Sequence, residues 1–351
     1  MAKRKASSGG IFRKFIIVLA VLVVIGLGGT LLFYYLRYFG PNVTGNKEYL
    51  YIHTGENFDS VYKTIRDEGI VKDTTTFSWA AHNMKYVERV KPGRYRLHEG
   101  MSNRKFIRML ALGEQDPVEL SFHVFRTKEQ FAAFAGSKLE TDSLTLLHYL
   151  DSAKFVQQYG FNTDDAFVMF MPDTYQFYWN VSPEKLFKRM YAHYENFWTP
   201  ERKQQAAAIG LSPAQVSILA SIVDAEAVYD DEMPTIAGLY LNRLRKGMKL
   251  QSDPTVIFAM HDFTIHRVLN KYLTNPSPYN TYVHTGLPPG PVMMPSVNAV
   301  KSVLNYKKSD YLYMVAKADF SNRHNFAATK AEHEINARKF QKALDEHNIK
   351  K

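Results

Sequence analysis

One acidic residue stands among apolar residues on a segment that is predicted to be a helix. Ser212, Pro213 and Gln215 are typical of a helix start: an N-cap, a proline at the first helical position and a capping-box partner. At about 100° per residue, the aliphatic residues that follow share one side of this helix, and Glu226 falls in the middle of that side. An ionised carboxylate there costs several kcal/mol unless its pKa rises. Because a general acid at neutral pH needs a raised pKa, Glu226 is the first catalytic candidate.

A second carboxylate, Asp224, precedes Glu226 by two residues but points to another side of the predicted helix. It lies about 160° from Glu226 on the helical wheel, so the two acids are not expected to face each other as the pair of a two-acid glycosidase does. We expect Asp224 to be solvated. A structural alternative for Glu226 stays open, in which the apolar side widens near the helix end and the carboxylate pairs with an arginine.

Two further polar candidates lie on the next predicted helices. One helix is expected over residues 233–247, with Asn242 as a polar contributor. Asp253 precedes Pro254 and is expected to be the N-cap of the helix that begins at this proline. A purely structural role as a cap therefore competes with a functional role for Asp253.

The segment 276–291 is rich in proline and glycine and is predicted to be a rigid, non-helical loop. Loops of this length in compact domains commonly carry function. Tyr279 and Tyr282 offer ring faces and Asn280 an amide, which suits stacking on sugars and binding of their hydroxyls. Packing of both tyrosines against the body of the protein is an equally open interpretation.

Composition and motifs exclude several kinds of chemistry. The 351 residues include no cysteine, which removes disulfides, thiol nucleophiles and cysteine-based metal sites. His333 and Glu334 begin like a zincin helix but lack the second histidine, and no serine-hydrolase, P-loop or dinucleotide motif is present. We therefore expect neither a metal nor a cofactor.

The net charge of +10 is concentrated at the N-terminus. Residues 1–37 hold six of the 44 basic residues and none of the 34 acidic ones, which leaves 38 basic against 34 acidic groups in the rest of the chain. Mixed charges of this kind give no basic stripe, so a nucleic-acid partner is not expected.

A membrane-span pattern follows the N-terminal charges. Nineteen uncharged residues run from Phe15 to Phe33, long enough at about 1.5 Å per residue to cross roughly 30 Å of hydrocarbon. The basic residues before them predict a cytoplasmic tail over residues 1–14, a transmembrane anchor over 15–36 and an extracytoplasmic remainder. A cleaved signal peptide is the alternative, but its apolar core would be shorter and would precede a small-residue cleavage site.

Periodicity and turn signals predict an α+β protein with two soluble parts. Residues 37–47 are expected to be a linker, and residues 48–113 a small α+β unit with two strands and three helices. Residues 114–351 are expected to form a mixed α+β catalytic domain, with a connecting part over 118–198 and a motif-rich part over 200–351. The small unit is equally interpretable as a spacer or as a ligand-binding domain.

Eight motifs in a fixed order extend over nearly the whole chain after the N-terminal tail. They are Lys91-Pro-Gly-Arg-Tyr-Arg-Leu97, Pro172-Asp-Thr-Tyr175, Ala220-Ser-Ile-Val-Asp-Ala-Glu226, Leu241-Asn-Arg-Leu-Arg245 with Gly247-Met248, Leu250-Gln-Ser-Asp-Pro-Thr255, Tyr279-Asn-Thr-Tyr282, Gly286-Leu-Pro-Pro-Gly290 and His324-Asn-Phe326. With these motifs and the single N-terminal anchor, the chain resembles the endolytic murein transglycosylase, or YceG-like, family.

The resemblance implies an enzyme of the bacterial inner (cell) membrane that cuts the glycan strands of peptidoglycan internally, with a LysM-like unit before the catalytic domain. The family's essential glutamate is the second acid of an E-x-E-like motif and matches Glu226. The first acid is Asp224 here, a departure that is tolerable at a peripheral position. Peptidoglycan synthases at the membrane are expected as partners.

Taken together with the position of Glu226, the resemblance implies that this residue protonates the glycosidic oxygen between N-acetylmuramic acid and N-acetylglucosamine. It then removes the proton of the muramyl 6-hydroxyl, giving a 1,6-anhydro product and terminating nascent strands. The residues expected to hold the sugar are Asn242, Gln251, Asp253, Thr255, Tyr279, Asn280 and Tyr282. Two alternatives stay open: a hydrolytic muramidase with Asp253 or Asp173 as second acid, and a non-catalytic scaffold that binds glycan through residues 48–113.

Overall fold

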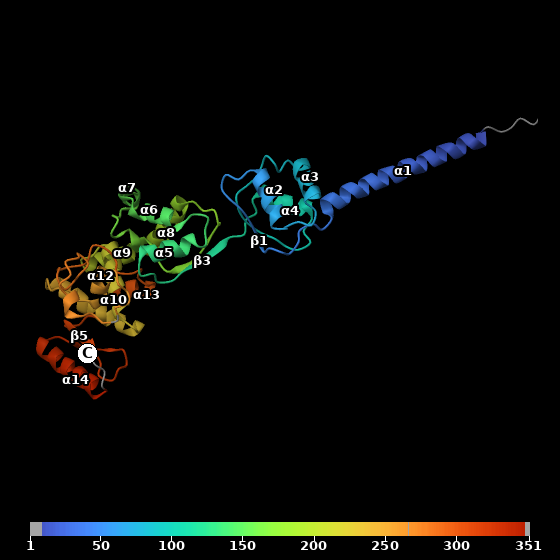
Figure 1. Ribbon diagram of the computed structural model, residues 1–351. Helices are drawn as coiled ribbons and strands as arrows, with labels where there is room; N and C mark the ends of the chain where they lie inside the picture. Colours follow the sequence, from blue (N-terminus) through green and yellow to red (C-terminus); the bar gives the residue numbers. More distant parts are fainter. Residues whose placement is uncertain (1–8, 266, 348–351) are drawn as a thin grey trace, which may run out of the picture. The chain divides into compact units, whose positions relative to one another are not determined.

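The computed structural model describes residues 9–265 and 267–347 (Figure 1). Contacts divide the chain into an N-terminal unit, residues 1–118 with 178–180, and a C-terminal unit, residues 119–177 with 181–351. Within the described residues, the strands form three two-stranded sheets that pair β1 with β2, β3 with β4 and β5 with β6. Helices supply most of the remaining structure, so the expected α+β class is confirmed.

The N-terminal unit consists of α1 (Gly9–Phe39), β1 (Tyr49–Ile52), α2 (Phe58–Asp67), α3 (Thr74–Asn83), β2 (Gly93–Arg96) and α4 (Asn103–Leu112). Strands β1 and β2 are antiparallel, with Tyr49 opposite Arg96 and Ile52 opposite Gly93. The rings of Phe58, Phe77 and Phe106 are buried between the helices. The two strands and three helices expected for residues 48–113 are therefore present.

Helix α1 contains the predicted anchor. Over Phe12–Phe39 it is long and apolar enough to cross a membrane, by length and composition. Its large apolar side chains are exposed, as Leu31 (70%) and Val24 (68%) illustrate. Apolar side chains in such number have no core to fill within this protein, which is the pattern of a helix that meets lipid.

Residues 37–47 do not form the expected free linker. Helix α1 continues to Phe39, and the next residues are built into the N-terminal unit through β-bridges from Pro41 to Ser102 and from Val43 to Val71. The side-chain amide of Asn42 is buried and donates to the backbone oxygen of Asp73 and to Oδ1 of Asn103, both at 2.8 Å. Sequence polarity suggested a linker, but here the polar groups are satisfied by the neighbouring helices.

The C-terminal unit begins with β3 (Val118–Phe122), which crosses the boundary between the units. Its further elements are α5 (Lys128–Gly136), α6 (Ser143–Asp151), α7 (Ala153–Val156), β4 (Asp173–Phe177), α8 (Pro183–Phe197), α9 (Pro200–Ala208), α10 (Pro213–Glu226), α11 (Met233–Arg245), α12 (Asp253–Met260), α13 (Val297–Leu304), β5 (Tyr313–Ala316), β6 (His324–Ala327) and α14 (Lys330–Glu346). Short 3-10 turns occupy Gln157–Tyr159, Ala166–Met169, Asp230–Glu232 and Asn270–Tyr272. The segment 276–291 contains neither helix nor strand, as expected.

Helix α10 is the central element of the C-terminal unit. It starts with the predicted capping box, in which Ser212 and Gln215 exchange side-chain to backbone hydrogen bonds. Every residue from Val216 to Val223 is buried, because α9, α11, α12 and α13 pack around it. A helix that is buried on all sides holds its C-terminal residues in a fixed place.

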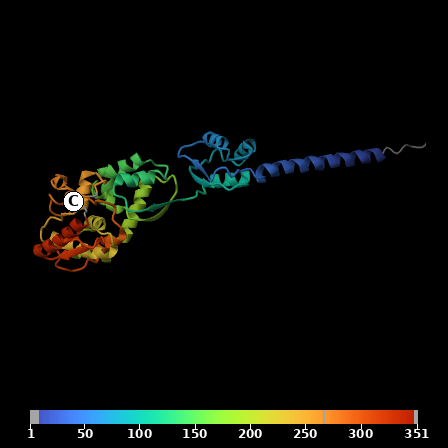
Figure 2. The same cartoon turned by 60° about the horizontal axis from the view of Figure 1, so that its bottom comes forward.

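The β5–β6 hairpin forms one wall of the candidate site. Tyr313 pairs with Ala327 and Ala316 with His324 in an antiparallel register, and α14 packs on β5. The red C-terminal segments lie next to the yellow and orange segments that contain α10, α11 and α12 in both views (Figure 2). Elements distant in sequence thus meet around the end of α10.

Candidate active site

Glu226 is the last residue of α10. The backbone of Ala227 is extended (φ −89°, ψ 128°) and ends the helix there. Two hydroxyl groups donate to Glu226 Oε1, that of Tyr240 at 3.0 Å and that of Ser252 at 2.6 Å. Among the described residues, no hydrogen bond reaches Oε2. One carboxylate oxygen is therefore fixed while the other is available to a ligand.

Burial is the main influence on this carboxyl group and raises its pKa above the ordinary glutamate value. The hydrogen bonds from Ser252 and Tyr240 act in the opposite direction, because they favour the ionised form. The negative charge of Asp253 raises the pKa further and His324 lowers it. The net shift is upward, which allows Glu226 to carry a proton closer to neutral pH than a solvated glutamate can.

Glu226 opens into a cavity of about 250 Å³. Its lining includes Gln251, Asp253 and Tyr282 together with His324 and residues 314–316 of strand β5. The hydroxyl group of Tyr282 donates to Asp253 Oδ1 at 2.7 Å. Acidic, amide and phenolic groups thus surround an acid whose second oxygen is available, an arrangement that suits a polyhydroxylated ligand.

The floor of the cavity depends on a buried arginine. Arg243 is only 8% exposed, and its guanidinium donates to the backbone oxygens of Leu312 at 2.6 Å and Leu250 at 2.7 Å. Next to this contact, Gln251 has a left-handed backbone (φ 52°), which turns the chain so that Ser252 faces Glu226. Among the described residues, Glu226 forms no ion pair with an arginine, and the guanidinium of Arg243 binds carbonyl groups instead.

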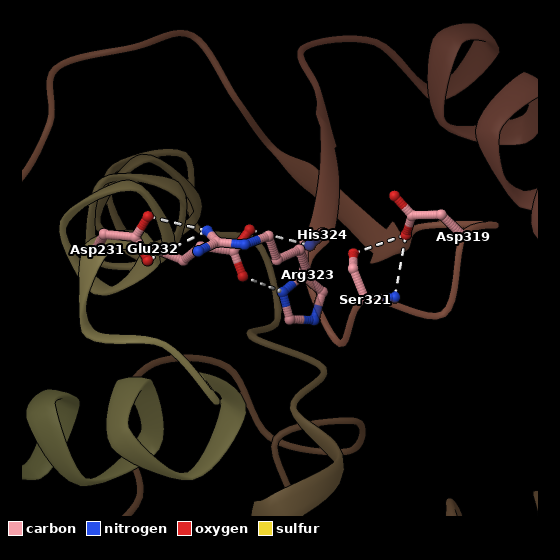
Figure 3. A network of polar contacts seen from close by, with 6 residues as sticks. All are labelled: Asp231, Glu232, Asp319, Ser321, Arg323 and His324. Carbon is pink, nitrogen blue, oxygen red and sulfur yellow. Dashed lines mark hydrogen bonds and ion pairs between the residues drawn. The ribbon is translucent and has the colours of Figure 1, made fainter.

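A polar network attaches the hairpin to the start of α11 (Figure 3). Glu232 is buried and accepts the backbone N–H of His324 at 3.0 Å, with Nδ1 of the same residue at 3.3 Å. Arg323 forms an ion pair with Asp231 at 2.9 Å. Asp319 accepts hydrogen bonds from the backbone and the hydroxyl group of Ser321 in the turn between the strands. When Nδ1 carries a proton it donates to Glu232, and His324 is thereby held at the cavity wall.

Four of the eight predicted site residues line this cavity: Glu226, Gln251, Asp253 and Tyr282. Asp253 is the first residue of α12 rather than its cap. The N-cap is Ser252, and its side chain makes no capping hydrogen bond because it donates to Glu226 instead. The cap prediction for Asp253 was therefore wrong by one residue.

The structure places three other predicted residues within the protein framework. Asn242 donates its amide to the backbone oxygens of Ser309 at 2.6 Å and Tyr311 at 3.1 Å. Thr255 is fully buried and donates to the backbone oxygen of Ser252. Asn280 is fully buried as well, and its amide donates to two backbone oxygens in the preceding segment. None of the three lines the cavity at Glu226, and their contacts hold its walls in place.

Tyr279 lines a different cavity, at the other end of α12. This second cavity has a volume of about 210 Å³ and includes Phe258 and His261. The ring centroids of Tyr279 and Phe258 lie 4.7 Å apart, so the tyrosine packs the loop onto the helix. The loop 276–291 therefore contributes one tyrosine to each cavity.

Asp224 is not solvated, contrary to expectation. Its Oδ2 accepts the backbone N–H of Ser296, the N-cap of α13, at 2.6 Å. Burial raises the pKa of this carboxyl group, and the hydrogen bonds from Ser296 partly oppose that shift. The helical wheel considers α10 alone and could not show that α13 covers this side.

Ser252, Tyr240 and Arg243 are functional candidates that sequence reasoning did not select for the site. Nothing in the sequence pattern indicated that the hydroxyl group of Tyr240 reaches Glu226. Asp173, one suggested second acid, lies on β4 with His193 Nε2 3.4 Å from its carboxylate and does not line the cavity. Within the described residues, no group of three or more histidines and acids could hold a metal ion.

Comparison with known proteins identifies the family. The model of the YceG-like family matches residues 50–339. The endolytic murein transglycosylase of Bacillus subtilis is 28% identical over 287 residues, which is 76% of this chain and 78% of that protein. The protein of the same name from Streptococcus pneumoniae (strain D39) is 29% identical over 296 residues, 76% of this chain but only 53% of that protein. A crystal structure of a YceG-like protein from Listeria monocytogenes has a TM-score of 0.56 at 24% identity and covers 82% of this chain and 98% of its own. The chain belongs to the YceG-like family.

Proposed function

We propose that this protein is an endolytic peptidoglycan lytic transglycosylase that uses Glu226 as its single acid and base. The observation that carries the proposal is the state of this carboxyl group: its pKa is raised by burial, its Oε1 is held by two hydroxyl groups, and it lines an open cavity. The names of the related proteins from Bacillus subtilis and Streptococcus pneumoniae support the same activity.

In the first step, Glu226 donates its proton to the glycosidic oxygen that leaves C1 of N-acetylmuramic acid, and the C1–O bond breaks. Glu226, now a carboxylate, takes the proton of the muramyl 6-hydroxyl while the oxygen of that hydroxyl group forms a bond to C1. The products are a 1,6-anhydromuramyl end and a free 4-hydroxyl on N-acetylglucosamine. No water is consumed, and the carboxyl group of Glu226 is protonated again at the end of the reaction.

The neighbours of Glu226 fit the two roles. Burial favours the protonated acid at the start, while the hydroxyl groups of Ser252 and Tyr240 stabilise the carboxylate formed after proton transfer. Gln251, Asp253 and Tyr282 are positioned to bind sugar hydroxyls and amides. We assign the framework contacts of Asn242, Thr255 and Asn280 to support of these groups.

A hydrolytic muramidase is the second candidate, because Asp253 lines the same cavity and could activate water. Mass spectrometry of digested murein distinguishes the two reactions. We expect anhydro ends, lighter by one water than the reducing ends that hydrolysis gives. The variant Asp253→Asn should still yield anhydro products. If the wild-type protein gave only reducing ends, the transglycosylase assignment would be wrong and the protein would be a hydrolase.

We further propose that α1 remains in the bacterial cell membrane as a single-pass anchor, with the rest of the chain on the extracytoplasmic side. The length of this apolar helix favours a retained span over the shorter apolar core of a cleaved signal, whereas its exposed side chains fit both. Intact mass of the protein from washed membranes tests it, because signal cleavage would remove the helix. The LysM-like character of the small unit and an association with peptidoglycan synthases remain predictions.

A further inference from the structure

The C-terminal end of α1 is packed against the small unit rather than joined to it by a free segment. Helix α1 contacts both α3 and α4. The side-chain amide of Asn103, at the start of α4, donates to the backbone oxygen of Arg37 at 2.9 Å. Tyr38 packs against the hydrophobic core of this unit. Because α1 packs on α3 and α4, these two helices are the part of the small unit that lies next to the C-terminal end of α1.

Aromatic side chains gather where α1 meets α3. The ring of Trp79, on α3, lies 5.5 Å from that of Tyr34 and 5.1 Å from that of Tyr38. Tyr35 and Phe39 stack at 5.2 Å on an exposed part of α1. Tryptophan and tyrosine are enriched where a protein passes from hydrocarbon to lipid headgroups, because their rings are apolar and their edges polar.

Two arginines lie within this aromatic group. The guanidinium carbon of Arg37 is 4.0 Å from the ring centroid of Phe33 and 5.2 Å from that of Trp79. The guanidinium carbon of Arg104, on α4, is 5.2 Å from the ring centroid of Phe39. Arg104 has no acidic partner among the described residues. Cations at this level suit the phosphate groups of anionic phospholipids.

The position of these aromatic and basic side chains along the membrane normal follows from the length of α1. A hydrocarbon core of about 30 Å accommodates about 20 residues of helix, so a span that starts at Phe15 ends near Tyr34. Trp79 contacts both Tyr34 and Tyr38 and is therefore at the level of the headgroups.

We propose that the side of the small unit formed by Trp79, in the middle of α3, and by the start of α4 lies on the membrane surface, with Trp79 and Arg104 among the headgroups of anionic phospholipids. This inference rests on the proposed insertion of α1 and is independent of the chemistry at Glu226. The N-terminal unit is then a membrane-bound platform and not a module that moves freely on a tether.

Fluorescence quenching by brominated lipid tests this contact in the full-length protein. With Trp179→Phe and Trp198→Phe, Trp79 is the remaining tryptophan. The protein is reconstituted in nanodiscs of phosphatidylcholine and phosphatidylglycerol, with bromine on the upper part of the acyl chains. We expect loss of Trp79 emission on adding brominated lipid, and a smaller loss when Arg104→Glu is introduced. Lys63→Glu, on α2, is the matched control and should leave the quenching unchanged, because α2 does not take part in the group.

Two probes separate the possible outcomes. A protein that retains only Trp198, which is buried in the C-terminal unit, should show no quenching. A protein whose three native tryptophans are replaced by phenylalanine and which carries Phe33→Trp reports insertion of α1 itself. Quenching of the Phe33→Trp probe without quenching of Trp79 would overturn the proposal and leave the anchor intact. Absence of quenching in both would overturn the membrane insertion as well, with no bearing on cleavage by Glu226.

Discussion

The end of α10 carries two carboxyl groups that lie in different regions of the C-terminal unit. Glu226 faces a cavity, with hydroxyl donors on one oxygen. Asp224, two residues earlier, accepts the backbone N–H of Ser296 at the start of α13. Burial raises the pKa of both. A raised pKa alone therefore does not identify a catalytic acid; access to a cavity and an oxygen left available distinguish the two.

Exchange of each acid for its amide tests this distinction most directly. Glu226→Gln removes both the proton donor and the base, so we expect the rate of murein cleavage to fall by about 10²- to 10⁴-fold. Asp224→Asn keeps an acceptor for Ser296 and should cleave at close to the wild-type rate. Release of soluble anhydromuropeptides from purified sacculi measures both. Equal losses in the two variants would show that the acids act as a pair.

Asp224, which is not expected to take part in cleavage, is expected to contribute to the free energy of unfolding. Asp224→Ala leaves the backbone N–H of Ser296 without its partner, which should lower the free energy of unfolding by about 1–3 kcal/mol in denaturant titrations. Asp224→Asn is the matched control and should lose much less. Burial raises the pKa of Asp224 in the folded state above its value in the unfolded chain. The proton-linked part of its contribution to the free energy of unfolding is therefore fully present below the ordinary aspartate pKa and is lost as pH rises through the raised value. Asp224→Asn should remove this part of the pH dependence.

The pH profile of cleavage provides a finer test of the Glu226 environment. Activity should fall on the alkaline side as Glu226 loses its proton. Ser252→Ala removes a hydrogen bond that favours the carboxylate, so the pKa of Glu226 rises and the alkaline limb moves to higher pH. Asp253→Asn removes a negative charge that raises this pKa, so the limb should move to lower pH. Shifts in the same direction in both variants would contradict the electrostatic account.

The smallest effect is expected from the tyrosines of the loop. Tyr282→Phe loses the hydrogen bond to Asp253, worth about 0.5–1.5 kcal/mol, and should raise KM a few-fold. Tyr279→Phe changes only the cavity at the other end of α12 and should leave kcat and KM unchanged. A larger effect of Tyr279→Phe on KM would extend the substrate site to that second cavity.

The sequence allowed the acid to be found because helical periodicity is a property of α10 itself. Position 226 belongs to the apolar side whatever packs against it, so the wheel indicated correctly that burial would raise the pKa of Glu226. The α+β class and the irregular loop followed from equally local signals. The prediction for Asp224 was wrong because its surroundings come from α13, which a single-helix projection does not contain.

Residue type was a poor guide to the remaining site residues. Asn280 and Thr255 suit a sugar ligand chemically, yet both are fully buried and hydrogen-bonded within the protein. Conversely, Ser252 was not selected as a site residue, and its contact with Glu226 depends on the left-handed backbone of Gln251. Such contacts arise from the register of segments distant in sequence, which no local pattern encodes.

The contact between Glu232 and His324 has a consequence for the order in which the enzyme matures. The two residues are 92 positions apart, and the later one belongs to the hairpin that completes the cavity. In the topology proposed above, the residues that follow α1 leave the translocation channel first, so Glu226 emerges before the hairpin does. During that interval the cavity would lack the wall formed by His324 and β5, so we expect no cleavage until the hairpin has folded. The order of export thereby delays the activity until the C-terminal part of the chain has folded.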